Sequence, residues 1–207
     1  MGENAPYKSF SRVYDIFDLI FSLGRKGNPR LGLLDVIGNT PLSVLDIGVG
    51  TAASAMVVAS QNDKNHIVGI DISEAMLAVA RRKIARRSLS NLEVFNMSAT
   101  DIRYPDHSFD VVMVSFALHE FEYPLREKIF QEISRVLKPG GIFCVIDFAP
   151  QDNRGNQIFL KLWKLVEPSC FADFLDMDWR AHLTAYGMQF ESEREFSFSK
   201  LYLLRKT

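Results

Sequence analysis

The chain has 207 residues, of which 47% are apolar and 24% are charged, and this composition excludes a disordered chain, a collagen-like repeat and a small disulfide-stapled protein. Lys and Arg total 24 against 25 Asp and Glu, which gives a net charge of −1 and no overall positive field to attract nucleic acid or an anionic membrane. We therefore expect one compact domain whose partner is a small molecule or a protein.

Two helices and a strand are predicted before the first glycine-rich turn. Apolar residues at helical spacing over residues 9–23 predict an amphipathic helix that lies on the body of the protein. A second, short helix is expected over residues 29–37. Residues 43–47 are apolar and are followed by glycines, which predicts the first strand.

The chain then alternates between strand-like and helix-length segments. Ser73 should cap a helix that runs to about Ser88, and another helix over residues 124–137 should end at a C-cap and turn formed by residues 138–141. This alternation predicts a parallel sheet wound by crossover helices. The further strands are predicted at residues 66–71, 92–96, 110–115 and 142–147.

The end of the chain breaks this alternation. Residues 150–188 show no regular pattern, whereas residues 189–197 and 201–205 predict two strands joined by a tight turn at Ser199 and Lys200. A two-residue connection permits only antiparallel pairing. The predicted fold class is therefore α/β, with a doubly wound, mostly parallel seven-stranded sheet that ends in an antiparallel hairpin.

The glycine turn after the first predicted strand is the most informative motif. Gly48 and Gly50 let a ligand approach the backbone, and the following amides would face it. The segment from Gly48 to Ala53 fits the dinucleotide pattern G-x-G-x-x-A, so a nicotinamide-dependent oxidoreductase is an alternative. Asp46 argues against it, because a carboxylate at the mouth of the turn would repel a pyrophosphate. Asp71 ends the second strand, where a doubly wound sheet presents a carboxylate to a ribose.

A ribose, a cationic amino acid portion and no phosphate are together the features of S-adenosylmethionine. At this point the chain resembles the class I S-adenosylmethionine-dependent methyltransferases, especially the small-molecule subgroup that includes the menaquinone and ubiquinone C-methyltransferases. The resemblance covers residues 44–147 and rests on VLDIGVGTA, GIDISEAML, YPDHSFDVVMVSFALHEF and ISRVLKPGGIFCVIDF. It implies a Rossmann-like methyltransferase fold and transfer of a methyl group to a small-molecule acceptor by in-line displacement.

The resemblance also implies a cofactor site along the strand ends. Asp46, Gly48 and Gly50 would line the methionine portion of the cofactor. Asp71 would hold the ribose hydroxyls, and Ile72 would flank the adenine.

Two departures from the family pattern concern this site. Ala52 stands where the family often has a third glycine, and Ser98 followed by Ala99 stands where it often has an acid beside the adenine. A serine hydroxyl can still bond the exocyclic amine, so we expect cofactor binding to survive. Asp101 is the nearby acid if the register is shifted.

Four more residues complete the expected site. Ser115 and Phe116 fall where family members place backbone around the sulfonium, and Tyr14 resembles the tyrosine of an N-terminal Tyr-Asp pair that could close over the cofactor. His119 would face the open end of the sheet and is the candidate general base if the acceptor atom carries a proton. No metal site is expected.

The resemblance implies a single methyltransferase domain over residues 1–207. Its expected parts are an N-terminal helical cap at 1–40, a cofactor-binding core at 41–148, a helical lid at 149–188 and a terminal hairpin at 189–207. A catalytically silent methyltransferase-like binding module stays open as an alternative function. The oligomeric state also stays open, with a homodimer as one option.

The cysteines and the start of the chain indicate where the protein works. Cys144 and Cys170 lie among large apolar residues without a CxxC partner, which predicts buried free thiols in a reducing compartment. The first ten residues show neither a signal nor a transit pattern. No apolar run reaches the roughly 18 residues of a membrane helix. We therefore expect a cytoplasmic protein that does not bind a membrane.

Overall fold

The computed structural model describes residues 28–151, 154–163 and 170–207. The helix expected over residues 9–23, and Tyr14 with it, lie outside the described residues. The elements in chain order are η1 (Pro29–Leu31), α2 (Gly32–Ile37), β1 (Ser43–Ile47), α3 (Ala53–Gln61), β2 (His66–Asp71), α4 (Glu74–Arg86), β3 (Leu92–Asn96), β4 (Phe109–Ser115), η2 (Leu118–Glu120), α5 (Tyr123–Val136), β5 (Leu137–Phe148), α6 (Arg154–Trp163), α7 (Cys170–Leu175), α8 (Trp179–Thr184), β6 (Met188–Glu195) and β7 (Ser199–Lys206).

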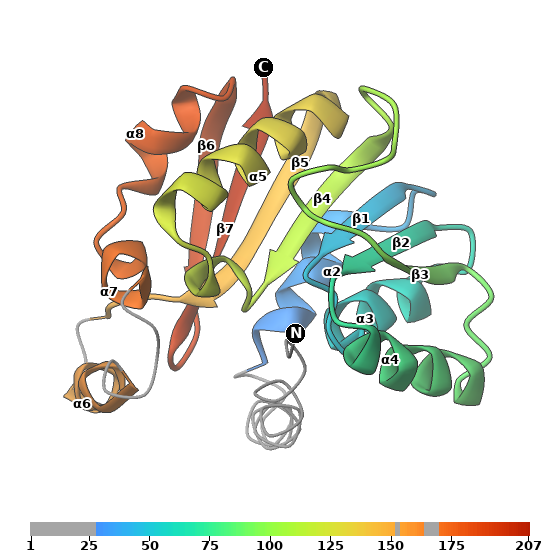
Figure 1. Cartoon of the computed structure of the whole chain (residues 1–207), viewed down its shortest axis with the longest axis horizontal. Coiled ribbons are helices and arrows are strands. Elements are labelled where there is room, and N and C mark those ends of the chain that lie inside the picture. The colour runs from blue at the N-terminus through green and yellow to red at the C-terminus, as the bar shows by residue number, and fades with distance from the viewer. Residues whose placement is uncertain (1–27, 152–153, 164–169) are drawn as a thin grey trace, which may run out of the picture.

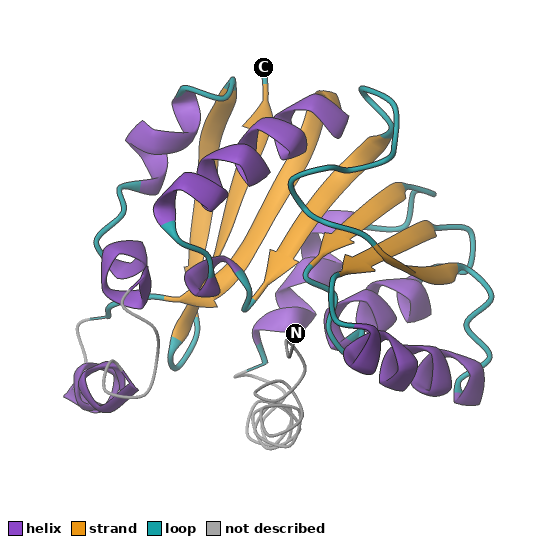
Figure 2. Ribbon diagram, viewed as in Figure 1, coloured by secondary structure: helices purple, strands orange, loops and turns teal. Residues whose placement is uncertain are grey.

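A single seven-stranded sheet organises these elements (Figure 1), with the strand order β3-β2-β1-β4-β5-β7-β6. The five strands from β3 to β5 are parallel. The last two pair antiparallel with β5 and with each other. The predicted fold class is confirmed, including the C-terminal antiparallel strands. Figure 2 shows the helices packed around the sheet.

The core has two layers, one on each face of the sheet. Adjacent residues of a strand point to opposite faces, so Val44 of β1 packs with the layer that holds α2, α3 and α4, whereas Leu45 packs with the layer that holds α5, α7 and α8. Val111 and Val112 of β4 divide in the same way. Strands buried on both faces read as continuous apolar runs, which is why their sequences predicted them so well.

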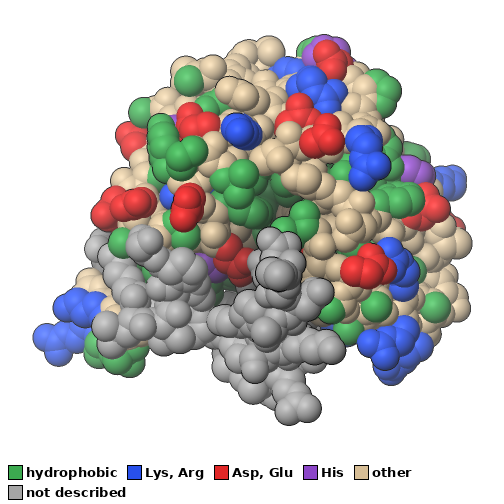
Figure 3. Space-filling view, viewed as in Figure 1, with side chains coloured by type: hydrophobic (Ala, Val, Ile, Leu, Met, Phe, Trp, Pro, Cys, Tyr) green, Lys and Arg blue, Asp and Glu red, His purple; other side chains and the backbone are tan. Residues whose placement is uncertain are grey.

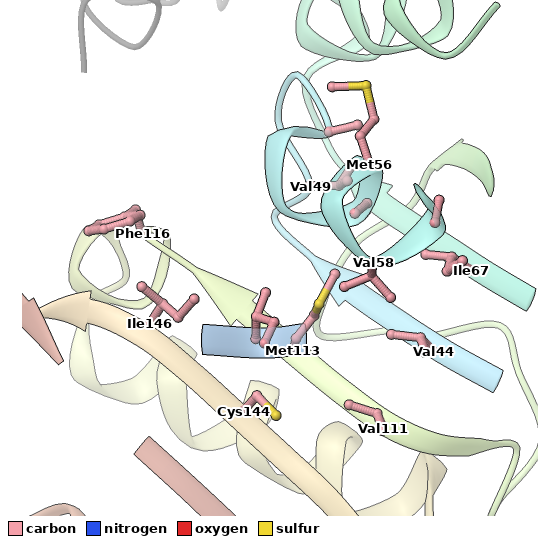
Figure 4. Close-up of a cluster of buried hydrophobic side chains, with 14 of the residues drawn as sticks. Val44, Val49, Met56, Val58, Ile67, Val111, Met113, Phe116, Cys144 and Ile146 are labelled. Atoms are coloured by element: carbon pink, nitrogen blue, oxygen red, sulfur yellow. The ribbon is translucent and has the colours of Figure 1, made fainter. Parts of the chain in front are cut away.

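The layer under α3 is drawn in Figure 4, where Val58 of α3 lies over Val44, Met113 and Ile67 of the sheet and Met56 points away from these strands. These side chains are all at most 3% exposed. Complete burial of each stabilises the fold by roughly 1.5–3 kcal/mol. On the surface, acidic and basic side chains are interspersed across the face seen in Figure 3, in keeping with the net charge of −1.

The helix predicted after β2 is confirmed together with its cap. The Ser73 hydroxyl accepts a hydrogen bond from the Met76 amide at 3.4 Å, which satisfies one of the free amides of the first turn. Glu74 lies in that first turn and Lys83 and Arg86 lie in the last, as the helix dipole favours.

The predicted C-cap and turn at residues 138–141 are wrong. Helix α5 ends at Val136, and its C-cap Leu137 has an extended conformation and already pairs with Phe109 of β4. Residues 138–141 therefore lie within β5, where the register shifts before Ile142 pairs with Val111. Pairing with Phe109 satisfies backbone hydrogen-bonding groups at Leu137. The end of α5 therefore does not need a glycine C-cap, and the strand begins directly after the helix.

The terminal turn was predicted with the right length and the wrong place. The Phe196 amide donates to the Ser199 carbonyl at 2.8 Å, and the Ser199 amide donates back at 3.4 Å. The two turn residues are therefore Ser197 and Phe198, and Ser199 and Lys200 begin β7. Ser199 pairs with Phe148 of β5, which fixes it in the sheet. Residues 150–188, which gave no regular pattern, contain helices α6, α7 and α8.

Candidate active site

Four parallel strands end at one edge of the sheet, and each carries a polar residue at its last or next-to-last position. These residues are Asp46 in β1, Asp71 in β2, Ser115 in β4 and Asp147 in β5. The chain crosses from one side of β1 to the other, since β1 pairs with both β2 and β4. Ligands of doubly wound sheets bind outside the carboxyl ends of the strands at such a point.

The turn between β1 and α3 has the left-handed backbone that its glycines predicted. Gly48 has φ +67° and Gly50 has φ +52°. A Cβ atom at Gly48 would lie 2.7 Å from the Cβ atom of Ala117, so the turn and the segment after β4 approach each other closely only because this side chain is absent. Ala52, at the position of the family's third glycine, also has a left-handed φ of +65°, which costs about 1–2 kcal/mol in a residue with a Cβ atom.

Gly48→Ala should lower the free energy of unfolding by about 2–4 kcal/mol, because it combines a left-handed alanine with a steric contact in a packed layer. Thermal unfolding measured beside the wild type checks this value. Gly140→Ala is the matched control, since Gly140 has φ +74° but nothing within 4 Å of a Cβ atom. Equal losses in the two variants would show that the contact with Ala117 contributes nothing.

Asp71 joins the glycine turn to the start of α4. Its Oδ2 accepts the amide of Gly50 at 2.8 Å, and its Oδ1 accepts the amide of Ser73 at 2.8 Å. Burial raises the pKa of this carboxyl, while the backbone hydrogen bonds lower it. Each carboxylate oxygen has a second lone pair, so Asp71 can accept two further hydrogen bonds from a ligand.

Asp46 is the most unusual ionisable group in this region. It is 2% exposed, and its Oδ1 has no hydrogen-bond partner among the described residues. Burial raises its pKa to about 8, Arg30 lowers it and the nearby Asp71 raises it further. An unpaired buried carboxylate is costly unless a cation reaches it, so this oxygen is suited to a positively charged ligand group.

The residues expected around an adenine lie beside Asp71. Ile72 follows it directly and is 62% exposed, which leaves an apolar surface that a flat ring could cover. The Ser98 hydroxyl shares a 2.8 Å hydrogen bond with the Thr100 hydroxyl and accepts the Thr100 amide. It is therefore already engaged in its own turn. Ala99 is half-buried against the core, and Asp101 is exposed.

The end of β4 brings Ser115 and Phe116 to the same edge. The Ser115 hydroxyl is buried and has no hydrogen-bond partner among the described residues. Phe116 has φ +54°, its amide donates to Ile146 at 2.7 Å, and its ring lies 5.7 Å from the Arg30 guanidinium carbon. Strained backbone that the surrounding structure holds in place is typical of ligand sites.

His119 lies in η2, directly after this segment, and is 2% exposed. Its Nδ1 is 2.6 Å from Oδ1 of Asp147. Asp147 is fully buried, and it also accepts the amides of Leu118 at 3.1 Å, of His119 at 3.4 Å and of Phe148 at 2.8 Å. The imidazole is further enclosed by the rings of Phe148, Phe171 and Phe174, at centroid distances of 5.0, 5.6 and 6.1 Å.

Comparison with known proteins assigns this arrangement to a family. Residues 44–141 match the family described as "Methyltransferase domain". The chain is 35% identical over 162 residues to a demethylmenaquinone methyltransferase of Listeria welshimeri, covering 77% of this chain and 66% of the relative. It is 32% identical over 165 residues to one of Clavibacter sepedonicus, covering 76% of this chain and 64% of the relative. Residues 44–141 of this chain therefore belong to the methyltransferase family.

Solved structures of this family agree on the fold. A SAM-dependent methyltransferase from Aquifex aeolicus superposes with a TM-score of 0.69 at 22% identity, over 88% of this chain and 91% of that one. At this identity the likeness shows the fold alone. The chain spans less than two thirds of the length of the two curated relatives, 66% of one and 64% of the other. The family match and the curated relatives confirm the resemblance to the methyltransferases. The family implies S-adenosylmethionine as its cofactor.

The residues at the strand ends fit that cofactor. The unpartnered Asp46 oxygen suits the ammonium of the methionine portion, and Asp71 has lone pairs left for two ribose hydroxyls. The left-handed Gly48, where a side chain would collide with Ala117, keeps the turn open to a close ligand. The structure thus brings Asp46, Gly48, Gly50 and Asp71 around one loop.

Sequence reasoning missed two charged residues here. Arg30, in η1, faces Asp46 and Phe116, and its Nε donates to the Ser54 hydroxyl at 3.2 Å. Nothing in its local sequence marks it. Asp147 could have been predicted from the sequence, because it lies at the end of a predicted strand as Asp46 and Asp71 do.

Proposed function

We propose that this chain transfers a methyl group from S-adenosylmethionine to a small-molecule acceptor by in-line displacement. The observation that carries the proposal is the buried Asp46, which lies in β1 just before the glycine turn and has an oxygen without a hydrogen-bond partner among the described residues, while Asp71 accepts the Gly50 amide of the same turn. The bound cofactor supplies a methyl group already activated by its sulfonium. The protein then has to orient the two reactants and exclude water, which lowers a barrier by several kcal/mol.

Within this proposal, Asp46 binds the ammonium of the methionine portion and Asp71 binds the ribose. Ile72 covers the adenine, with Ser98 and Ala99 at its edge. Ser115 and Phe116 lie beside the sulfonium.

Calorimetric titration with S-adenosylhomocysteine tests the cofactor assignment. We expect micromolar binding of this product above pH 8, where Asp46 is ionised, and no binding of reduced nicotinamide cofactor under the same conditions, because the carboxylate would repel its pyrophosphate. Binding of the nicotinamide cofactor instead would overturn the proposal in favour of an oxidoreductase. Binding of neither would favour a module without catalysis.

We further propose a flat, apolar acceptor. The relatives that carry the name demethylmenaquinone methyltransferase and the aromatic rings around His119 both support this class. The rings of Phe116 and Phe148, with centroids 5.4 Å apart, extend this apolar environment toward the sulfonium. An apolar site also strengthens any charge interaction within it.

His119 is the proposed general base, and Asp147 is its positioning residue. An ionised Asp147 can only accept hydrogen bonds, so the 2.6 Å contact places the proton of the neutral imidazole on Nδ1. Nε2 then keeps its lone pair and can take a proton from the acceptor atom. This role requires an acceptor that loses a proton during methylation.

Asp147→Asn should reverse this arrangement. An asparagine has one carbonyl oxygen for the four donors that Asp147 now serves, and its NH₂ group would meet the imidazole. Nδ1 then accepts, Nε2 carries the proton, and kcat falls by at least about 100-fold while S-adenosylhomocysteine binding is unchanged. The measurements are ¹⁵N shifts of His119 and methyl transfer to a short-chain demethylmenaquinol.

Glu122→Gln, at an exposed position next to η2, is the control and should keep both the tautomer and kcat. An Asp147→Asn variant with the wild-type His119 tautomer and a normal kcat would remove the positioning role.

No helix in the described part of the chain is long and apolar enough to cross a membrane. Cys144 and Cys170 are buried and in no disulfide, which supports the proposal of a cytoplasmic protein.

A further inference from the structure

A groove of about 580 Å³ lies between the N-terminal half of α5 and helices α7 and α8. Its walls include Tyr123, Met177, His182 and Tyr186. None of its lining residues comes from the glycine turn or from the ends of β1 and β2. The groove is therefore separate from the proposed cofactor site, and its volume is within the range of small-molecule sites.

Arg126 of α5 is a buried cation in the wall of this groove. It is 1% exposed, and its Nε has no hydrogen-bond partner among the described residues. Its Nη2 has one distant contact, 3.5 Å from the Cys170 carbonyl, and its guanidinium carbon lies 5.6 Å from the centroid of Phe174. Burial lowers the pKa of this guanidinium. A buried charge without an ion pair is costly, so its presence calls for an explanation.

The acidic groups around Arg126 do not pair with it. Glu127 accepts from His182 Nε2 at 2.7 Å and from the Tyr186 hydroxyl, so both of its oxygens are engaged. Asp147 serves η2, as described above. Asp173 and Asp178 are exposed to solvent at the groove, where water and salt screen them. Because these carboxylates repel further negative charge, a ligand with a single negative charge is favoured next to Arg126 over a dianion.

The walls indicate the shape of what the groove could hold. The His182 ring lies 5.8 Å from Tyr123 and 6.0 Å from Tyr186, measured between centroids. Met177, a flexible apolar side chain, lies on the same groove. Such walls suit a planar apolar body, and a guanidinium offers a fork of donors that matches a carboxylate.

We propose that the groove between α5, α7 and α8 binds a small planar monocarboxylate through Arg126. Phe174 packs under the guanidinium on one side and against His119 on the other. Phe174 is 1% exposed and His119 is 2% exposed, so these two side chains separate the groove from the acceptor region. The ligand is therefore a second small molecule, which binds without entering the site of methyl transfer.

Ligand-observed NMR and calorimetry on the full chain test this proposal with benzoate as the probe. We expect benzoate to bind, and we expect benzamide, its uncharged analogue, and phenyl phosphate, a dianion, to bind at least about tenfold more weakly. Arg126→Met should abolish benzoate binding while the melting temperature stays equal or rises, because a buried unpaired charge is replaced by an apolar side chain.

Two further variants serve as a control and as an independent test of the groove. Arg82→Met removes one exposed arginine of α4 and should leave benzoate binding unchanged. Ala185→Trp fills the groove from its exposed rim and should block benzoate without removing Arg126. S-adenosylhomocysteine binding should be unaffected in all three, which separates this site from the cofactor site.

The proposal is overturned if benzamide binds as well as benzoate, if Ala185→Trp leaves benzoate binding unchanged, or if Arg126→Met retains it. A melting temperature that falls steeply in Arg126→Met would show instead that the arginine serves the packing of α5 on α7. Tighter binding of phenyl phosphate than of benzoate would overturn the monoanion assignment.

Discussion

Asp71→Ala should weaken binding of S-adenosylhomocysteine by at least about 100-fold, since two hydrogen bonds from ribose hydroxyls to a carboxylate are lost. The same change leaves the amides of Gly50 and Ser73 without their acceptor. The glycine turn then loses its tie to α4 as well as its contact with the ribose. Isothermal titration calorimetry at a temperature where the variant is folded, as judged by circular dichroism, gives the affinity.

Asp101→Ala is the control for Asp71→Ala. Asp101 is an exposed acid on the segment after β3, and it is the residue that would serve the adenine if the alignment of that segment were shifted. We expect its removal to leave the affinity within about twofold, as surface changes usually do. An unaltered isotherm in Asp71→Ala would remove the ribose assignment, and a large loss in Asp101→Ala would move the adenine contact to that residue.

Asp46→Asn should weaken binding of S-adenosylhomocysteine by at least about 100-fold, because a buried ion pair with the ammonium of the ligand is lost. In the wild type the pKa of Asp46 is about 8, and only the ionised form attracts the ammonium. The affinity of the wild type should therefore rise with pH and level off above about 8. The asparagine variant should lack this rise, which titrations at several pH values will show.

The same substitution should stabilise the protein without ligand at alkaline pH. The folded-state pKa of Asp46 lies above the ordinary value of 3.8, so its contribution to stability is fully present below pH 3.8 and is lost as pH rises toward 8. The melting temperature of Asp46→Asn relative to the wild type should accordingly increase between pH 5 and pH 8. A constant difference across this range would show that the carboxyl is not buried in its charged form.

The sequence predicted the parallel part of the fold almost to the residue. The predicted strands at residues 43–47, 66–71 and 92–96 coincide with β1, β2 and β3. Strands β1 and β2 are buried on both faces and therefore read as short apolar runs between polar turns, whereas the border strand β3 alternates between buried and exposed residues at its start. Errors occur where pairing between distant strands decides the local structure. Leu137 belongs to β5 because it pairs with Phe109, and Ser199 belongs to β7 because it pairs with Phe148. Neither pairing can be predicted from the sequence around these residues.

The candidate site divides in the same way. Asp46, Gly48 and Asp71 follow from strand ends and from a turn that needs left-handed backbone, and both are local features. Arg30 and Arg126 could not be predicted, because their importance depends on burial beside residues far along the chain. The cofactor and catalytic roles of individual residues, and the division into cap, core, lid and hairpin, stay predictions.

The position of β6 has a consequence for how this protein meets its own copies. It forms one border of the sheet, opposite β3, and a border strand has free backbone groups to which another chain could attach. Glu191, Glu193, Arg194 and Glu195 lie exposed along β6, and the pairing with β7 is irregular between Phe190 and Ser192. Charge and irregular pairing both discourage edge-to-edge stacking, so continuous sheets across molecules are disfavoured, and any homodimer should form through a different surface.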